Sequence, residues 1–305
     1  MTALADWLRT WRRRLKSGLP YVRRREHQIL QRKYADLIAA VDGGAPPAAS
    51  AAWQWLQPVE GELAGEVGLF VAFTDQPRLQ PHVAEHVAFL AAAGIALVLV
   101  INTDVPAERL EIEPRLRARA RGIAVRANVG YDFGAWAHAL AVLPPTPRWK
   151  RLFLVNDSMI GPLEAGNFDR LLGRLRASSA DVVGLTEAQL PARHLQSYFL
   201  VFNERALQGG SVTRLFGRVR NWPAKLQVID VHETRLTGLL EAEGLRTEAL
   251  FPSLSGDALS SDDTSLRWAQ LIEQGLPYVK TRVAAAHAGD ARIKAWLAAR
   301  PSPPG

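Results

Sequence analysis

The hydrophobic residues of this chain fall into short runs rather than long periodic blocks. Six mostly apolar runs stand out: Val67–Phe73, Ala96–Ile101, Gly122–Ala127, Arg151–Val155, Asp181–Leu185 and Ser197–Phe202. Near-continuous apolar runs, without strict alternation of apolar and polar residues, are typical of strands that are buried on both faces of a sheet. We therefore expect a central sheet that is covered on both sides.

Helical patterns separate the first four of these runs. The segments are His82–Ala93, a second segment that opens at Pro106, and Phe133–Leu143. Strands that alternate with helices favour a parallel sheet with right-handed crossovers. The expected fold class is α/β, with a mostly parallel, doubly wound sheet and helices on both faces.

Residues 1–41 show a different pattern, that of a basic amphipathic helix. Apolar residues recur at the spacing of one helical face: Leu4, Trp7, Leu8, Trp11 and Leu15. Such a helix can lie in the headgroup layer of an anionic membrane, or its apolar stripe can dock on the protein's own body. The pattern does not choose between the two, so an anionic membrane surface is a candidate partner of this segment.

The stretch that follows is rich in Gly, Pro and Ala. Residues 42–50 are not expected to form a regular element, and residues 42–64 are expected to be a linker. Trp53 and Trp55, near its end, are expected to pack against the body of the protein. The remaining predicted units are the main domain, residues 65–282, and a C-terminal helix with a Pro-rich tail, residues 283–305.

Composition and charge narrow the classes of function. Of 305 residues, 48% are hydrophobic and 22% are charged, as in ordinary globular proteins. The absence of Cys excludes disulfides, thiolate metal sites, iron–sulfur clusters and a cysteine nucleophile. The net charge of +7 lies in residues 1–41, which hold ten Lys or Arg against three Asp or Glu. The rest of the chain is neutral, which argues against a nucleic-acid-binding domain.

The sequence also bears on location. The longest uncharged apolar stretch, Val87–Ile101, is shorter than the about 20 residues that span a membrane. The basic N-terminal run has no apolar segment after it, unlike a signal peptide. We expect a cytoplasmic protein, with peripheral association at the inner face of the cytoplasmic membrane as an option.

Polar residues follow the first four predicted strands directly. They are Thr74 and Asp75, Asn102 to Asp104, Asn128, and Asn156 to Ser158. The ligand crevice of an open α/β sheet lies at the carboxyl ends of its strands. Taken one by one, these residues are also the preferred caps and turn formers after a strand. Four strands that end alike favour a binding site.

The usual phosphate-binding and metal-binding motifs are missing. There is no G-x-G-x-x-G and no G-x-x-x-x-G-K-[ST] segment, so a bound diphosphate must be met by a cation, by Lys or Arg, or by a helix N-terminus. Asp157 is a candidate ligand of a divalent cation, Mg or Mn. His82 and His86 have metal-ligand spacing, but without an H-E-x-x-H pattern we expect a solvated helix face.

Several segments resemble the rhamnan synthesis protein F family. Those that carry the resemblance are Asn128–Trp136 (NVGYDFGAW), Leu154–Leu163 (LVNDSMIGPL), Gly184–Thr186 (GLT), His194–Phe202 (HLQSYFLVF) and Gly275–Lys280 (GLPYVK). Their order and spacing agree over about residues 65–282. Asn128–Trp136 also resembles the N-x-G turn of family 2 glycosyltransferases.

The resemblance implies a GT-A-like glycosyltransferase of bacterial surface polysaccharide synthesis. The implied donor is a nucleotide-activated sugar, with dTDP-rhamnose first, and the implied acceptor is a growing or lipid-linked saccharide. Asn156-Asp157-Ser158 stands where many such enzymes carry D-x-D. One acidic residue in place of two leaves metal dependence open, and it also fits a non-catalytic subunit that binds donor or polymer.

The resemblance also implies which residues would bind the donor. Thr74, Asp75, Asn102 and Asp104 would line the base and ribose end of the donor. The sugar or its diphosphate would meet Asn128, Tyr131, Asp132, Asn156 and Ser158. Asp157 would hold a cation or a sugar hydroxyl, although Asp132 and Asp157 are also ordinary capping residues.

Glycosyl transfer also needs a base for the acceptor hydroxyl and a counter-charge for the leaving diphosphate. Glu233 is the candidate base, at the start of a predicted helix, with Asp230 and His232 as local rivals. His194, Gln196, Ser197 and His232 are candidate acceptor contacts, and Lys280 is a candidate phosphate contact. Each of these residues could equally be an ordinary side chain that faces solvent or caps the backbone.

Overall fold

A computed structural model of the chain describes residues 44–254 and 262–302. The described residues from Pro46 onward form one compact unit. The amphipathic segment predicted over residues 1–41 lies outside the described residues. Within the described ranges, every helix is too short or too polar to cross a membrane.

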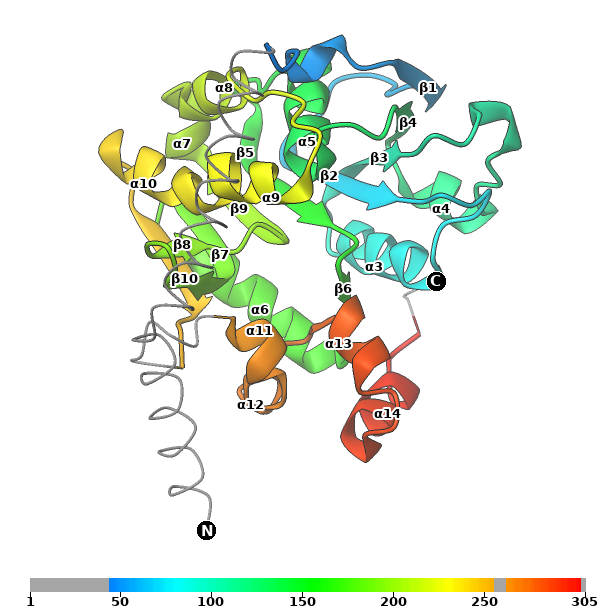
Figure 1. Cartoon of the computed structure of the whole chain (residues 1–305), viewed down its shortest axis with the longest axis vertical. Helices are drawn as coiled ribbons and strands as arrows, with labels where there is room; N and C mark the ends of the chain where they lie inside the picture. Colours follow the sequence, from blue (N-terminus) through cyan, green and yellow to red (C-terminus); the bar gives the residue numbers. More distant parts are fainter. Residues whose placement is uncertain (1–43, 255–261, 303–305) are drawn as a thin grey trace, which may run out of the picture. The chain divides into compact units, whose positions relative to one another are not determined.

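A nine-stranded sheet forms the centre of the fold (Figure 1). Its strands are β1 (Trp53–Gln57), β2 (Gly65–Phe73), β3 (Ala96–Asn102), β4 (Gly122–Arg126), β5 (Trp149–Asn156), β7 (Val182–Ala188), β8 (His194–Leu195), β9 (Phe199–Asn203) and β10 (Thr247–Phe251). The spatial order is β1-β4-β3-β2-β5-β9-β7-β10, and β8 pairs with β7. The first half, β4-β3-β2-β5, is fully parallel.

Strand direction changes only around β9 and at the margins of the sheet. β9 lies antiparallel between β5 and β7, and β10 pairs parallel with β7. β1 and β8 are antiparallel to their neighbours. The sheet is therefore mostly parallel, which confirms the predicted α/β class and is consistent with a GT-A-like fold.

The helices connect these strands and cover the sheet. They are α3 (Pro81–Ala92), α4 (Pro114–Arg119), α5 (Tyr131–Val142), α6 (Ala165–Ala177), α7 (Glu204–Gln208), α8 (Ser211–Phe216), α9 (Lys225–Val228), α10 (Thr234–Ala242), α11 (Asp263–Leu266), α12 (Trp268–Glu273), α13 (Thr281–Ala286) and α14 (Ala291–Ala298). Short turns of other helical types are Ala48–Ser50, Ala107–Arg109 and the π-helical turn Ile229–Glu233.

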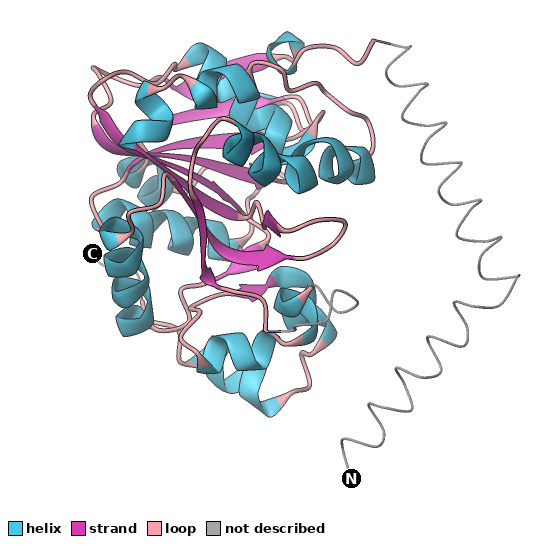
Figure 2. Ribbon diagram, turned by 90° about the vertical axis from the view of Figure 1, so that its left-hand side faces the viewer, coloured by secondary structure: helices cyan, strands magenta, loops and turns pink. Residues whose placement is uncertain are grey.

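Helices cover both faces of the sheet (Figure 2), and alternate residues of its buried strands point to opposite faces. On β2, Phe70 and Ala72 belong to the large core that includes side chains of α3, α4 and α6. Leu69 faces the other layer, where its carbonyl oxygen accepts a hydrogen bond of 3.2 Å from Trp136 Nε1 of α5. Burial on both faces explains why these strands carry continuous apolar runs.

Two sequence predictions need correction. The expected linker, residues 42–64, contains β1, which extends the sheet by pairing with β4. Trp53 of β1 packs on His138 with ring centroids 4.7 Å apart. The helix expected to run from Pro106 through Leu116 is two separate elements, a single turn at Ala107–Arg109 and α4. Pro114 is the first residue of α4, where the fixed backbone angle of proline suits a helix start.

A small two-stranded sheet ties the C-terminal region to the main sheet. β6 (Met159–Ile160) follows β5 almost directly and pairs antiparallel with β11 (Val279–Lys280). This pairing brings Lys280 opposite Met159, next to the turn that follows β5. α12, α13 and α14 pack there around a second apolar core that includes Trp268 and Val283.

Candidate active site

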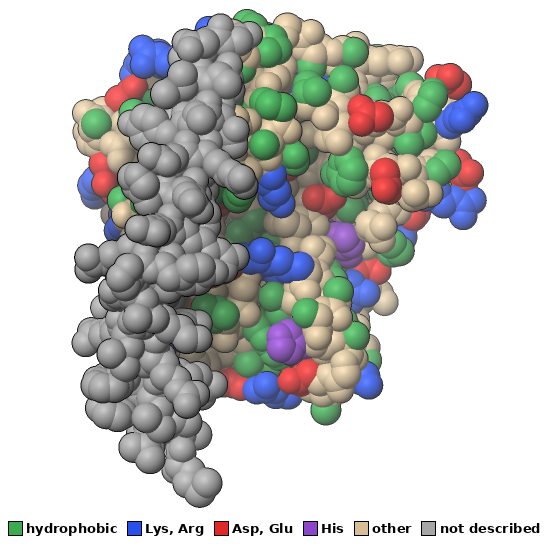
Figure 3. All heavy atoms as spheres, in the orientation of Figure 1, with side chains coloured by type: hydrophobic (Ala, Val, Ile, Leu, Met, Phe, Trp, Pro, Cys, Tyr) green, Lys and Arg blue, Asp and Glu red, His purple; other side chains and the backbone are tan. Residues whose placement is uncertain are grey.

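A cleft of about 480 Å³, lined by both polar and apolar side chains, lies at the carboxyl ends of the parallel strands β5 and β7. Its walls come from the start of α5, the turn after β5, the segment between β8 and β9, the α9–α10 region, and the start of α13. The face shown in Figure 3 is hollowed near its centre, with Lys or Arg side chains beside the depression. This is the position at which open α/β sheets bind their ligands.

The cleft brings together most of the site residues predicted from sequence. Those that line it are Tyr131, Asp132, Asn156, Ser158, His194, Gln196, Ser197, Glu233 and Lys280. They come from segments that are separated by up to about 150 positions in the chain. Their convergence gives the cleft amide, hydroxyl, carboxylate and ammonium groups within one volume.

The turn after β5 is held by its own asparagine. Asn156 is buried, and its Oδ1 accepts hydrogen bonds from Ser158 N at 3.0 Å and from Ser158 Oγ at 2.6 Å. Its Nδ2 donates to Oδ2 of Asp132, also at 2.6 Å. Asn156 therefore fixes the turn and the first acidic residue of α5 together.

The start of α5 depends on an unusual backbone. Gly130 has φ 70° and Tyr131 has φ 53°, so two consecutive residues are in the left-handed region. A side chain at Gly130 would have its Cβ 2.5 Å from Oδ1 of Asn221. The fully buried Arg126 donates from its guanidinium to that same Asn221 Oδ1 at 2.6 Å and also to the Val129 carbonyl. The contacts of Arg126 with Asn221 and Val129, here called the Arg126 clamp, thus hold the backbone that leads to Asp132. Strained backbone geometry of this kind is concentrated at functional sites.

Asp132 carries a perturbed carboxyl group. Burial and, to a smaller extent, the nearby charge of Asp157 raise the pKa of Asp132 to about 7, although Lys225 and the hydrogen bond from Asn156 oppose the rise. Lys225, at the start of α9, also lines the cleft. The two carboxyl groups repel each other, so a cation beside them would be favourable.

Asp157 does not line the cleft but lies directly behind it. Its Oδ2 accepts a hydrogen bond of 2.8 Å from Phe73 N, and its carbonyl oxygen lies 2.9 Å from His82 Nε2. Burial raises its pKa, although the hydrogen bond from Phe73 and the charge of His82 oppose this. His82 is therefore engaged by the turn, and His86 is buried against Tyr278 with its Nε2 2.9 Å from the hydroxyl. The two histidines therefore have separate partners, and the expected solvated helix face is wrong for His86, which is buried.

A divalent cation in the cleft would need oxygen donors, as carboxylate side chains supply. In the part of the chain that the structure describes, no three His, Asp or Glu side chains gather as a ready metal site. Asp132 and Asp157 supply two neighbouring carboxyl groups with raised pKa values. Mg²⁺ is commonly held by one or two carboxylates together with substrate phosphates and water. Asp132 fits that limited role from within the cleft, and Asp157 adds negative charge from behind it.

Six other predicted residues lie away from the cleft. Thr74 caps the turn after β2, Asn102 donates from Nδ2 to the Tyr131 carbonyl at 3.2 Å, and Asp104 accepts from Asn128 N at 3.4 Å. Asp75 is exposed in the same turn as Thr74. These residues shape the ends of β2, β3 and β4, and two of them support the segment that carries Tyr131.

His232, the last of the six, faces an apolar cavity of about 30 Å³ on another side of α5. Its ring stacks on Phe133 at 5.5 Å, and its Nε2 accepts a hydrogen bond of 3.1 Å from Trp222 Nε1. Burial lowers the pKa of His232 to about 4, so the ring is neutral near pH 7. Asp230 is likewise not among the residues that line the cleft.

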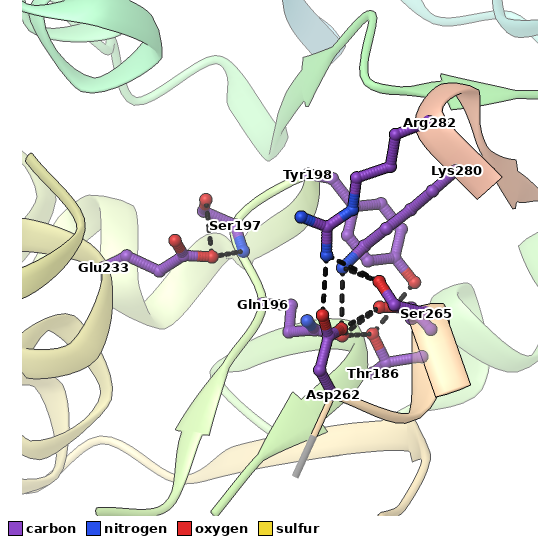
Figure 4. A network of polar contacts seen from close by, with 10 residues as sticks. Thr186, Gln196, Ser197, Tyr198, Glu233, Asp262, Ser265, Lys280 and Arg282 are labelled. Atoms are coloured by element: carbon purple, nitrogen blue, oxygen red, sulfur yellow. Dashed lines mark hydrogen bonds and ion pairs between the residues drawn. The ribbon is translucent and has the colours of Figure 1, made fainter. Parts of the chain in front are cut away.

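Glu233, in contrast, projects into the cleft from the π-helical turn Ile229–Glu233. Its Oε1 accepts hydrogen bonds from Ser197 N at 2.9 Å and Ser197 Oγ at 3.0 Å (Figure 4). Both bonds go to Oε1 and fix the carboxylate of Glu233. Its other oxygen, Oε2, takes no part in these two bonds. π-Helical turns are rare and are frequent at functional sites.

The opposite wall carries an ion-pair cluster that sequence reasoning found only in part. Lys280 Nζ lies 2.8 Å from Oδ1 of Asp262, and Arg282 lies 2.6 Å from Oδ2 of the same carboxylate (Figure 4). Asp262, Arg282 and Lys225 were not singled out from the sequence. The signal for Arg282 was its position two residues after Lys280, whereas Asp262 and Lys225 stand in segments without a recognisable motif.

The neighbouring candidates His194 and Gln196 are held by local contacts. His194 Nδ1 lies 2.8 Å from the Ala192 carbonyl oxygen. Gln196 Oε1 accepts a hydrogen bond of 2.6 Å from Thr186 Oγ1, whose oxygen also lies 2.9 Å from the Tyr198 hydroxyl. The amide nitrogen of Gln196 is thereby oriented for a further contact, since its oxygen is already engaged.

Comparison with known proteins agrees with the motifs. The family model for rhamnan synthesis protein F matches residues 97–297, about two thirds of the chain. A protein of Sinorhizobium fredii (strain NBRC 101917 / NGR234), named "Uncharacterized protein y4gN", is 29% identical over 199 residues. That match covers 63% of this chain and 50% of the relative, so the chain spans about half the length of the curated relative that it matches. The family match includes all residues that line the cleft.

Proposed function

Because this chain belongs to the rhamnan synthesis protein F family, we propose that it is a glycosyltransferase of bacterial surface polysaccharide synthesis. The donor would be a nucleotide-activated sugar, and the family description makes rhamnose from dTDP-rhamnose the first candidate. The acceptor would be a lipid-linked or growing saccharide. The observation that carries this proposal is the placement of Glu233, fixed by Ser197, in one cleft with Asp132 and Lys280.

Glu233 is proposed as the general base. Oε2 of Glu233 would accept the proton of the acceptor hydroxyl while that oxygen forms a bond to the anomeric carbon of the donor sugar. The bond from the anomeric carbon to the diphosphate oxygen breaks, and the nucleoside diphosphate leaves with the electron pair. A positioned base of this kind contributes about 10²- to 10⁴-fold to a rate.

The remaining cleft residues would bind and orient the substrates. Asp132 and the amide of Asn156 face the position proposed for the donor sugar. Lys225, Lys280 and Arg282 supply positive charge for the departing diphosphate, which is the usual need of such a leaving group. His194 and Gln196, on the β8–β9 side, would contact hydroxyl groups of the acceptor.

A divalent cation, where the protein uses one, would be held by Asp132 in the cleft, with Asp157 adding negative charge from behind it. Its chemistry would be to neutralise charge on the diphosphate. It would also offset the charge of Asp157, which together with burial raises the pKa of Asp132.

The alternative is a non-catalytic subunit that binds donor or polymer. The observation in its favour is Asp157, the acidic residue in the position of a D-x-D motif, which accepts a hydrogen bond from Phe73 behind the cleft. The two functions differ in turnover and not in binding.

The deciding experiment incubates the full chain with a panel of nucleotide sugars, with and without Mn²⁺. Binding is measured by calorimetry, and slow donor hydrolysis or transfer is measured by chromatography. The proposal predicts binding and turnover of one donor. Binding of a donor without hydrolysis or transfer to any offered saccharide would instead establish the binding subunit.

For the location, we propose peripheral association through residues 1–41 with the inner face of the cytoplasmic membrane. The observation is the basic amphipathic pattern of that segment. Flotation with anionic vesicles should retain the full chain and release a variant that lacks residues 1–41. Equal binding of both would contradict the proposal.

A further inference from the structure

The carboxylate of Asp262 is shared by two cations of the cleft. Lys280 Nζ donates to Oδ1 at 2.8 Å, and Arg282 donates to Oδ2 at 2.6 Å. Ser265 Oγ lies beside both cations, 3.3 Å from Lys280 Nζ and 2.6 Å from the Arg282 guanidinium. Each carboxylate oxygen is therefore matched to its own positive group, as two oxygens of a phosphate would be.

This arrangement differs from an ordinary surface ion pair in its position and burial. The Lys280 side chain is only 15% exposed, whereas Arg282 is 66% exposed. Both side chains line the cleft. Burial lowers the pKa of Lys280, and the charge of Asp262 and its hydrogen bond oppose that effect. The cluster carries two positive charges for one negative charge.

The charge distribution of the cleft locates an anionic ligand at this end. Asp132 and Asp157 place two carboxyl groups at the α5 side, and the positive charges that oppose their raised pKa values are Lys225 for both and His82 for Asp157. Lys280 and Arg282 make the other end positive. β11 also holds Lys280 opposite Met159, so the positive end directly adjoins the turn formed by Asn156 and Ser158. A diphosphate would be repelled by the first end and attracted by the second.

We propose that Lys280, Arg282 and Ser265 form a diphosphate-binding site for which Asp262 is an intramolecular competitor. The diphosphate replaces the Asp262 carboxylate on both cations, and its departure lets Asp262 return. The assignment of the diphosphate to a sugar donor rests on the proposed function, whereas the competition itself does not.

Asp262 is suited to this role because it stays ionised. Burial alone would raise the pKa of Asp262, but the charge of Lys280 and hydrogen bonds from Lys280, Ser265 and Thr264 lower it to about 2. The competing carboxylate is therefore charged throughout the neutral range. Removal of its charge should release both cations for a ligand.

The test measures binding of inorganic pyrophosphate to the full chain by isothermal titration calorimetry. Asp262→Asn keeps the size of the side chain and removes its charge, so pyrophosphate should bind about tenfold more tightly than to the unmodified protein. Asp290→Asn is the matched control, because Asp290 also pairs with an arginine, Arg292, but lies outside the cleft. It should leave the affinity unchanged.

Lys280→Met provides the second variant. It should weaken pyrophosphate binding by at least about tenfold, because a charge-assisted contact is lost. Unchanged or weaker binding in Asp262→Asn, with a thermal unfolding midpoint like that of the control, would overturn the competition. Unchanged binding in Lys280→Met would overturn the site.

A final arm identifies the source of the diphosphate. Pyrophosphate is titrated into protein that is saturated with dTDP. Loss of the binding heat assigns the site to the diphosphate of a nucleotide donor, and persistence assigns it to a diphosphate carried by the acceptor. A protein that transfers sugar but shows no effect of Asp262→Asn would refute this inference alone, and a protein with the pyrophosphate effect but no sugar transfer would refute the proposed function alone.

Discussion

Asn156 at the end of β5 donates a hydrogen bond of 2.6 Å to the carboxylate of Asp132 in the first turn of α5. The two residues lie in the two segments of the chain that most clearly resemble the family. Their side chains meet because β5 and the loop before α5 both end at the same edge of the sheet. This contact joins the turn after the central strand to the backbone that opens the cleft.

The first prediction concerns the stability provided by Asn156. Asn156→Ala removes the bond to Asp132 and both bonds to Ser158 from a buried position. The free energy of unfolding should fall by about 1–3 kcal/mol, because buried partners are left without hydrogen bonds. Urea unfolding measures this change.

The control for that substitution is Asn167→Ala. Asn167 lies on α6 and contacts exposed Glu164, so its loss should change the free energy of unfolding by less than about 0.5 kcal/mol. An equal effect of the two substitutions would show that Asn156 does not support the site.

The second prediction concerns the pH dependence of stability. The pKa of Asp132 is about 7 in the folded protein against 3.8 for an aspartate free in water, so the folded state holds a proton that the unfolded state releases. This carboxyl group therefore lowers stability progressively as the pH rises from about 4 to about 7. Asp132→Asn should be more stable than the unmodified protein by on the order of 2 kcal/mol at pH 8, and the difference should vanish near pH 4.

Asp290→Asn is the reference for this experiment. The pKa of Asp290 is lowered by Arg292, so its replacement should give no stabilisation at pH 8. Urea unfolding at several pH values distinguishes the two. A constant difference between Asp132→Asn and the unmodified protein across this range would contradict the raised pKa.

The third prediction concerns the left-handed turn before α5. Gly130→Ala forces a side chain into φ 70° and toward Oδ1 of Asn221, which is held by Arg126. The free energy of unfolding should fall by about 1–3 kcal/mol. Gly173→Ala, within α6 and with nothing near its Cβ position, should instead raise it by about 0.5–1 kcal/mol. If thermal or urea unfolding showed Gly130→Ala to be more stable than Gly173→Ala, the proposed support of this turn by Arg126 and Asn221 would be wrong.

The fourth prediction separates positioning from catalysis. Ser197 fixes Oε1 of Glu233 through its backbone N–H and its hydroxyl, and Ser197→Ala removes only the hydroxyl bond. We expect kcat to fall by about tenfold with little change in the KM for the donor, since one neutral-to-charged hydrogen bond is lost. Ser197→Thr keeps a hydroxyl and should recover part of the rate. A KM effect with unchanged kcat would place Ser197 in donor binding instead.

The central sheet could be predicted because each of its inner strands is marked by the residues of that strand alone. Strands β2, β3, β4 and β5 bury both faces, so each appears as an apolar run that ends in polar residues. β1 was missed because it is an edge strand, short and half-buried, after a stretch rich in Gly and Pro. Its place is determined by pairing with β4, a contact that no local pattern reveals.

The residues of the site likewise fall into those that local motifs reveal and those that only the fold brings together. Motifs located Asp132, Asn156 and Lys280, whose neighbours in sequence are distinctive. The cluster around Asp262 could not be found, because it forms only when the C-terminal segment returns to the turn after β5. His232 shows the converse limit, because it directly precedes Glu233 in the sequence, yet Glu233 enters the cleft and His232 faces an apolar cavity.

The measurement that tests the central claim most directly compares donor binding and sugar transfer in Glu233→Gln. The substitution keeps the size of the side chain and removes its ability to take a proton. Glu243→Gln is the control, because Glu243 pairs with Arg214 outside the cleft. With the donor that the panel identifies, Glu233→Gln should bind it with affinity within about threefold of the unmodified protein but transfer sugar about 10²- to 10⁴-fold more slowly. Transfer at the rate of the Glu243→Gln control would contradict the assignment of Glu233 as the base.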